Sequence, residues 1–169
     1  MSMRGGCGYV EEWSDPRVVR DAHLGSIWEG TSNVVALDVL RAINRDGALP
    51  ALRAHNEDLL QSASLDAAAR PSFLQFIERT HALADHAARN KRHELAREAA
   101  SALYHITTAV RLAREAVEPA LRHRLALAQM VLTHQLQARD PLTHASDDDH
   151  TMHSLLNESM RSPALQRFA

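Results

Sequence analysis

The feature that most constrains the fold is an apolar stripe that repeats with the period of an α-helix. Between residues 95 and 117, apolar side chains recur at spacings of four, four, three, four, three and four. Such spacing places them on one face of an amphipathic helix. A helix with one apolar face buries it against another element, so this segment predicts a helix that packs among others. The stripe consists of Leu95, Ala99, Leu103, Ile106, Val110, Ala113 and Val117.

Neighbouring segments show the same pattern, and the composition favours helices over strands. Further long stripes are expected over 73–87 and, beginning at Pro119, over 119–136, with shorter helices over 16–24, 33–45 and 50–60. Aromatic residues form only 4% of the 169 residues, and Ala, Leu and Arg are abundant. These residues favour helices, and the connections are short. We therefore predict an all-α fold, an antiparallel helical bundle preceded by a glycine-rich extended segment.

The pattern changes along the chain and suggests three regions. Residues 1–46 contain a glycine loop, a loop around Glu29 and a helix that is apolar on nearly every side from Asn33 to Ile43. A helix apolar all round is usually buried, so we expect this one to be buried. Residues 47–140 form the predicted bundle. Residues 141–169, with three consecutive aspartates at 147–149, are expected to form a polar tail.

Charge and cysteine content exclude several classes of protein. The formal net charge is −2, with 3 basic and 6 acidic residues in 1–40, 14 and 10 in 41–139, and 2 and 5 in 140–169. This distribution argues against a dedicated nucleic-acid module but leaves room for a local basic patch. No apolar run reaches membrane-spanning length, and the N-terminus does not resemble a signal peptide. Cys7 is the single cysteine, so a reducing, cytoplasmic setting is expected.

The densest group of candidate functional residues lies in the first 45 residues. Gly5 and Gly6 allow close approach of the backbone to another group. Glu29 lies between Trp28 and Gly30, just before a predicted helix N-terminus whose free N–H groups suit a phosphate. A carboxylate beside an indole is a candidate general base. The alternative is that Glu29 only favours the helix N-terminus electrostatically.

The first 41 residues contain three spaced segments that form a recognisable motif. These are Gly5-Gly6-Cys7-Gly8-Tyr9-Val10-Glu11-Glu12, Arg20-Asp21-Ala22 and Ile27-Trp28-Glu29-Gly30-Thr31. The segments resemble the C-terminal signature of the acyl-CoA dehydrogenase family. The continuation from Asn33 to Arg41 is more specifically similar to the AidB-like, alkylation-response branch of that family, and together the similar residues cover about 40 positions.

The resemblance implies a cofactor, a substrate and a role for each matching residue. It implies FAD as cofactor and an acyl-CoA thioester as substrate, with hydride passing to flavin N5. Glu29 matches the glutamate that removes the α-proton, and Gly30 matches the glycine beside the substrate. Thr31 and Asn33 match positions that contact the phosphate and adenosine regions of FAD. Gly5 and Gly6 match a loop that touches the FAD of a neighbouring subunit.

The resemblance also implies that much of the family's pocket is missing from this sequence. Family members carry an N-terminal helical domain, a β-domain over the flavin and most of a four-helix bundle ahead of this signature. We therefore expect a C-terminal fragment that lacks dehydrogenase activity alone. A helix that normally packs in a larger domain would expose apolar surface here, so a homo-oligomer is expected.

The alternative is a non-catalytic helical module that forms oligomers or binds double-stranded DNA. The region after residue 46 is similar in pattern and position to the extra helical region of the AidB-like branch, and Arg41 matches the DNA-binding role. Further basic residues could contact phosphates, but interleaved glutamates favour surface ion pairs. The basic residues are Arg89, Lys91, Arg92, Arg97, Arg111, Arg114, Arg122 and Arg124, and the glutamates are Glu94, Glu98, Glu115 and Glu118.

The histidines do not indicate a metal site. The chain has 11 histidines, but none shows the spacing of a zinc site. His81 and His86 are five residues apart and do not share a helix face, whereas His150 and His153 in the tail could chelate only weakly. We therefore predict no functional metal site.

Overall fold

The computed structural model describes residues 10, 14–25 and 30–138, and all regular structure in these residues is helical. This confirms the all-α prediction. The predicted glycine-rich extended segment and the polar tail lie outside the described residues, apart from Val10 and Ser14. No described helix is long and apolar enough to cross a membrane. The α-helices are α1 (Asp15–Leu24), α2 (Ser32–Asp46), α3 (Ala48–Gln61), α4 (Ala69–Arg89), α5 (Ala96–Glu115) and α6 (Arg124–Val131).

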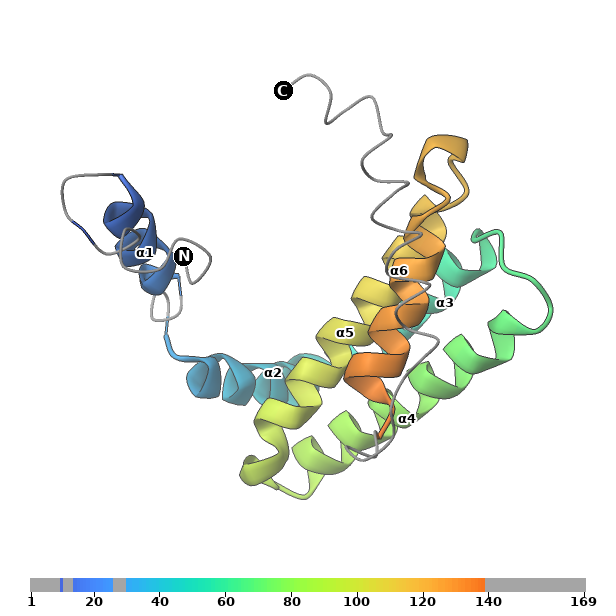
Figure 1. Ribbon diagram of the computed structural model, residues 1–169. Helices are drawn as coiled ribbons and strands as arrows, with labels where there is room; N and C mark the ends of the chain where they lie inside the picture. The colour runs from blue at the N-terminus through green and yellow to red at the C-terminus, as the bar shows by residue number, and fades with distance from the viewer. Residues whose placement is uncertain (1–9, 11–13, 26–29, 139–169) are drawn as a thin grey trace.

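Helix α5 is the centre of the bundle. It contacts α2, α3, α4 and α6, and successive helices from α3 to α6 reverse direction across short connections (Figure 1). A 3-10 turn, η2 (His93–Leu95), leads from α4 into α5. Helix α1 lies apart from this bundle and packs closely on none of its helices (Figure 1). The stripe predicted on α5 is buried from Ala99 to Ala113, because it faces four other helices, whereas Val117 at its end is 39% exposed.

Two apolar clusters fill the bundle, one toward each end of the α4–α5 pair. The cluster near the α4–α5 turn joins α2, α3, α4 and α5 and contains mainly alanines on the facing surfaces of α4 and α5. Small side chains let two helices approach closely. The cluster at the other end holds larger side chains, among them Phe73, Ile77 and Ile106, each 1% exposed or less. The interface near the α4–α5 turn, where α2 also packs, is therefore formed mainly by small side chains.

The prediction that helix 33–43 is buried was wrong for one face of the helix, and the apolar surface that this helix was expected to expose lies on that face. In α2 only Ala36 and Leu40 are buried, whereas Val34 and Val35 are 47% and 48% exposed. Helix α2 packs on α4 and α5 with one face, and no described residue covers the opposite face. The sequence pattern reports only that a helix is apolar, and burial also requires a partner for each face.

The prediction of one long helix beginning at Pro119 was also wrong. The chain forms a 3-10 turn, η3 (Pro119–Leu121), then α6, and ends in a π-helical turn, η4 (Leu132–Leu136). Glu118 before the proline is extended, which is the conformation that proline imposes on its predecessor. The N–H of Leu121 donates to Glu118 O and that of Leu125 to Arg122 O, so tight three-residue turns precede α6. Ala128 is buried in α6 and Leu132 in η4.

Enlarging Ala99 tests the close packing of α4 on α5. Ala99 is fully buried, so Ala99→Leu forces extra volume into the interface. We expect the free energy of unfolding to fall by about 1–3 kcal/mol, the usual effect of overpacking. Urea denaturation measures this change. The control is Ala54→Leu at an exposed position of α3, and equal stability of the two variants would contradict the packing account.

Candidate functional site

The loop before α2 positions the first group of candidate residues. Gly30 has φ of +110°, a conformation that side chains other than glycine rarely adopt. A Cβ atom at Gly30 would also lie 3.3 Å from Val34 Cγ1. A glycine is therefore required here for backbone reasons, whatever its role toward a substrate.

Thr31 begins α2 without capping it through its side chain. Its backbone is extended, its carbonyl accepts the N–H of Val35 at 3.1 Å, and its hydroxyl makes no capping hydrogen bond. The first N–H groups of a helix have no partner within the helix, and Thr31 does not satisfy them. The end of α2 at Thr31 and Asn33 is therefore a donor site that suits an anion.

The structure brings together only part of the predicted site. Gly30, Thr31 and Asn33 lie together at the N-terminal end of α2, and Thr31 and Asn33 are exposed. Glu29, Gly5 and Gly6 lie outside the described residues. Arg41 lies further along α2 on the wall of a separate pocket.

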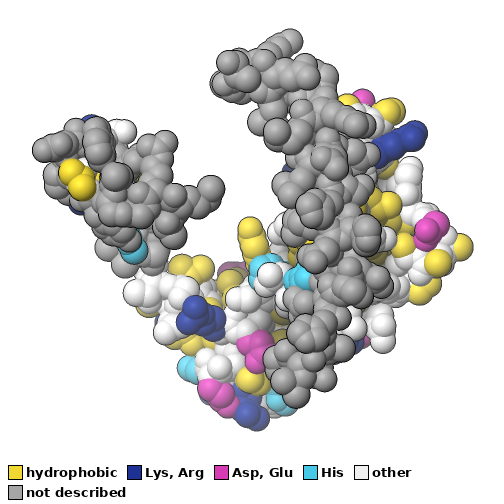
Figure 2. All heavy atoms as spheres, in the orientation of Figure 1, with side chains coloured by type: hydrophobic (Ala, Val, Ile, Leu, Met, Phe, Trp, Pro, Cys, Tyr) yellow, Lys and Arg dark blue, Asp and Glu magenta, His cyan; other side chains and the backbone are white. Residues whose placement is uncertain are grey.

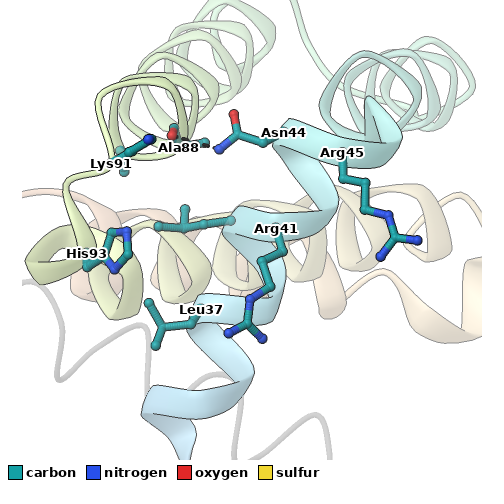
Figure 3. Close-up of a pocket in the computed structure, with 9 residues that line it drawn as sticks. Leu37, Arg41, Asn44, Arg45, Ala88, Lys91 and His93 are labelled. Atoms are coloured by element: carbon teal, nitrogen blue, oxygen red, sulfur yellow. Dashed lines mark hydrogen bonds between the residues drawn. The ribbon is translucent and has the colours of Figure 1, made fainter.

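This pocket lies between α2 and the C-terminal end of α4, and it has a volume of about 350 Å³ (Figure 3). Its apolar lining comes from Leu37, Leu40, Ala87 and Ala88. None of its lining residues in the described part of the chain is acidic. Sequence analysis did not foresee the pocket, because α2 and α4 are far apart in the chain. The basic lining residues are Arg41, Arg45, Lys91 and His93.

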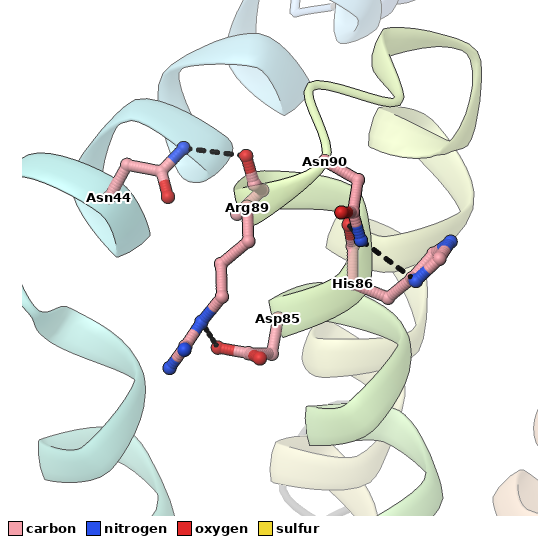
Figure 4. A network of polar contacts seen from close by, with 6 residues as sticks. Asn44, Asp85, His86, Arg89 and Asn90 are labelled. Carbon is pink, nitrogen blue, oxygen red and sulfur yellow. Dashed lines mark hydrogen bonds and ion pairs between the residues drawn. The ribbon is translucent and has the colours of Figure 1, made fainter.

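A polar network fixes the end of α4 beside this pocket (Figure 4). Asn44 Nδ2 in α2 donates a hydrogen bond to Ala88 O at 2.8 Å. Asn90 Nδ2 lies 3.0 Å from both His86 Nδ1 and His86 O, and Arg89 Nε pairs with Asp85 Oδ1 at 2.7 Å. The hydrogen bond from Asn44 connects α2 to the C-terminal end of α4, and Arg89 is engaged in an ion pair with Asp85.

Ion pairs also occupy other basic residues named as candidate phosphate contacts. Arg41 pairs with Asp38, Arg92 with Glu94, and Arg124 with Glu115. The pairing with Arg92 lowers the pKa of the exposed Glu94. On the face shown in Figure 2, Lys and Arg side chains are scattered among other residues. The interleaved glutamates thus form surface pairs at Arg92 and Arg124, and DNA binding at Arg41 stays a prediction.

His81 is a buried polar residue whose environment the sequence did not reveal. It is 4% exposed, and its Nδ1 lies 2.8 Å from Ile77 O, which fits an Nδ1–H donor. Burial lowers the pKa of His81, so the neutral ring is favoured. Nearby, Arg53 pairs with Glu57 at 2.9 Å and with Glu78 at 2.6 Å. Within the described ranges, no three His, Cys, Asp or Glu side chains are grouped as a metal site would require.

Comparison with known proteins shows homology over part of the chain. No protein-family model matches the chain, and no solved structure gives a significant match. The chain is 45% identical over 49 residues to the "Putative acyl-CoA dehydrogenase AidB" of Escherichia coli (strain K12), covering 29% of this chain and 9% of that protein. It is 46% identical over 57 residues to acyl-CoA dehydrogenase family member 11 of Caenorhabditis elegans. This match covers 33% of this chain and 9% of that protein.

These matches show partial homology to acyl-CoA dehydrogenases, and they support the resemblance drawn from the sequence motifs. The matched residues span about a tenth of the length of either relative. The FAD that the family implies therefore belongs to the full-length relatives.

The lowered pKa of His81 predicts a pH-dependent stability. The unfolded chain binds a proton at His81 near pH 6.5, whereas the folded chain resists it. We expect the neutral His81 ring to make its full contribution to the free energy of unfolding above pH 6.5. This contribution is lost as the pH falls from 6.5 through the lowered pKa of His81. Urea denaturation between pH 5 and 8 measures this. His81→Leu should flatten the profile relative to the exposed-site control His55→Leu, and an unchanged profile would contradict the assignment.

Proposed function

We propose that this chain is the C-terminal part of a FAD-dependent, acyl-CoA dehydrogenase-like oxidoreductase that carries out α,β-dehydrogenation of acyl-CoA thioesters. The observation that carries the proposal is the 45–46% identity over about 50 residues to two proteins named as acyl-CoA dehydrogenases. In this assignment Glu29 is the base that removes the α-proton, and Gly30 lies beside the substrate.

The geometry at the start of α2 is compatible with a phosphate group of FAD. Thr31 leaves the first N–H groups of the helix without a side-chain partner, and these donors and the helix dipole favour an anion. The left-handed backbone of Gly30 turns the chain into the helix directly after Glu29. Thr31 and Asn33 are therefore the residues of this chain that would hold a phosphate and the adjoining adenosine.

The chemical step assigned to this chain is a proton transfer. An α-proton of a thioester is weakly acidic, so a carboxylate must be held next to it in a site that excludes water. FAD, when bound, supplies the acceptor for the hydride. Because the matched segment corresponds to 9% of each relative, we expect most of the pocket to come from other residues and the chain alone to be inactive.

A proline at the first position of α2 tests the cofactor contact. Ser32→Pro removes one donor N–H, and the extended Thr31 is already compatible with a following proline. Losing one hydrogen bond to a charged phosphate should weaken FAD binding about tenfold. Quenching of flavin fluorescence during titration measures the affinity.

Two further variants serve as controls for this titration. Ser32→Ala keeps the backbone N–H and should bind FAD as the unaltered chain does. Glu29→Gln should also leave FAD binding unchanged, but it should abolish any exchange of acyl-CoA α-protons that the chain catalyses. Absence of FAD binding, or equal affinity of Ser32→Pro and Ser32→Ala, would contradict the cofactor assignment.

A second candidate function is oligomerisation through the outer apolar face of α2. Val34 and Val35 in α2 are 47% and 48% exposed. Large exposed apolar side chains beside one another are typical of an interface. We propose a second copy of this chain as the partner, because a symmetric dimer covers such a surface with an identical one.

A charge at Val35 tests the proposed interface. Val35→Asp places a carboxylate in the surface that the second copy would bury, so we expect a dimer to dissociate to monomers. Sedimentation equilibrium measures the molecular mass. Val117→Asp, at an exposed apolar position after α5, should leave the dimer intact. A monomer for the unaltered chain, or a dimer for Val35→Asp, would refute this candidate.

A further inference from the structure

We propose that the pocket between α2 and the end of α4 binds a small molecule that carries a phosphate group next to an apolar part. This site is separate from the N-terminal end of α2, and it does not depend on the proposed flavin contact. The argument combines the backbone of Lys91, the charge on the pocket wall, and the size and polarity of the cavity.

Lys91 adopts a conformation in which glycine is the usual residue. Its φ is +54°, and no other described residue except glycine has a positive φ. The N–H of Lys91 donates to Ala88 O and that of Arg92 to Ala87 O at 2.9 Å, which is the Schellman arrangement at the end of α4. A lysine at this position strains the backbone where a glycine would not. Strain of this kind is a sign of a functional side chain.

The side chain of Lys91 lines the pocket together with His93 and Arg41. Figure 3 shows Lys91 and His93 on the α4 side and Arg41 on the α2 side, whereas the guanidinium of Arg45 turns away. Within the described residues Lys91 and His93 make no ion pair. The Asp38 and Glu94 carboxylates nearby are engaged by Arg41 and Arg92. The wall therefore offers the ammonium of Lys91 and the imidazole of His93 to an anion, whereas the guanidinium of Arg41 is shared with Asp38.

The floor and size of the pocket limit the ligand further. Leu37, Leu40, Ala87 and Ala88 provide apolar contacts below the basic wall. The volume of about 350 Å³ is near the lower end of the range for small-molecule sites. A DNA duplex instead meets cations spread along its phosphate backbone, and Arg89, Arg92 and Arg124 are engaged in ion pairs. A compact phosphate ester with an apolar group matches this pocket better.

Phenyl phosphate is the probe for this proposal, because it joins a phosphate dianion to an apolar ring. Isothermal titration calorimetry of the full chain should detect saturable binding that is at least about fivefold tighter than binding of inorganic phosphate. Lys91→Gly should weaken phenyl phosphate binding about tenfold, since it removes one charge-assisted hydrogen bond. The same variant should raise the melting temperature, because glycine relieves the backbone strain. Arg97→Ala, which alters a cation outside this pocket, should change neither property.

Several results would overturn the proposal. Absence of saturable binding, or equal affinity of Lys91→Gly and the unaltered chain, would show that the pocket is no phosphate site. Equal binding of inorganic phosphate and phenyl phosphate would overturn the requirement for an apolar part. A 20-base-pair duplex that binds through Lys91 while phenyl phosphate does not would assign the surface to DNA.

A second variant separates binding from folding. Lys91→Gln keeps a long side chain without its charge, and it should weaken phenyl phosphate binding even where Lys91→Gly alters the helix end. A lower melting temperature for Lys91→Gly would refute the argument from strain. Unchanged binding by Lys91→Gln would then refute the proposed site as well.

Discussion

The close contact between α4 and α5 is the interaction on which the rest of the structure depends. Ala84, Ala88 and Ala99 are almost completely buried where these helices meet, so their backbones approach with little side chain between them. The central position of α5 lets α2, α3 and α6 pack against the same pair (Figure 1). Because each of these helices buries one face on the pair, the arrangement fixes which faces remain for ligands or partners.

Helix α2 contributes residues to all three of the proposed functional surfaces. Its inner face packs through Ala36 and Leu40, and its outer valines stay exposed. Its N-terminal end follows Gly30 and is not capped by the side chain of Thr31, whereas Arg41 forms part of the pocket at the end of α4. The candidate flavin contact, the candidate interface and the basic pocket are therefore different surfaces of one helix. A single substitution can alter one of them and leave the others in place.

The sequence predicted what depends on local pattern and missed what depends on distant neighbours. The stripe on α5 follows from periodicity, and the structure buries it from Ala99 to Ala113. Within the predicted stripe over 119–136, Ala128 and Leu132 are buried, but the apolar pattern could not reveal that α6 begins only after Pro119 and a 3-10 turn. The exposure of Val35, the burial of His81 and the pocket beside Lys91 depend on which helices meet, and periodicity carries no such information. The chemistry assigned to Glu29 came from the resemblance, and its place lies outside the described residues.

We propose that the start of α2 is a cofactor contact inherited from acyl-CoA dehydrogenases. Nuclear magnetic resonance of the isotope-labelled chain tests it most directly, because each backbone amide reports separately on a bound phosphate. Adding FAD should shift the amide signals of Ser32, Asn33 and Val34 and leave those in the middle of α5 unchanged. Shifts confined to Lys91 and His93, or no shifts at all, would contradict the claim.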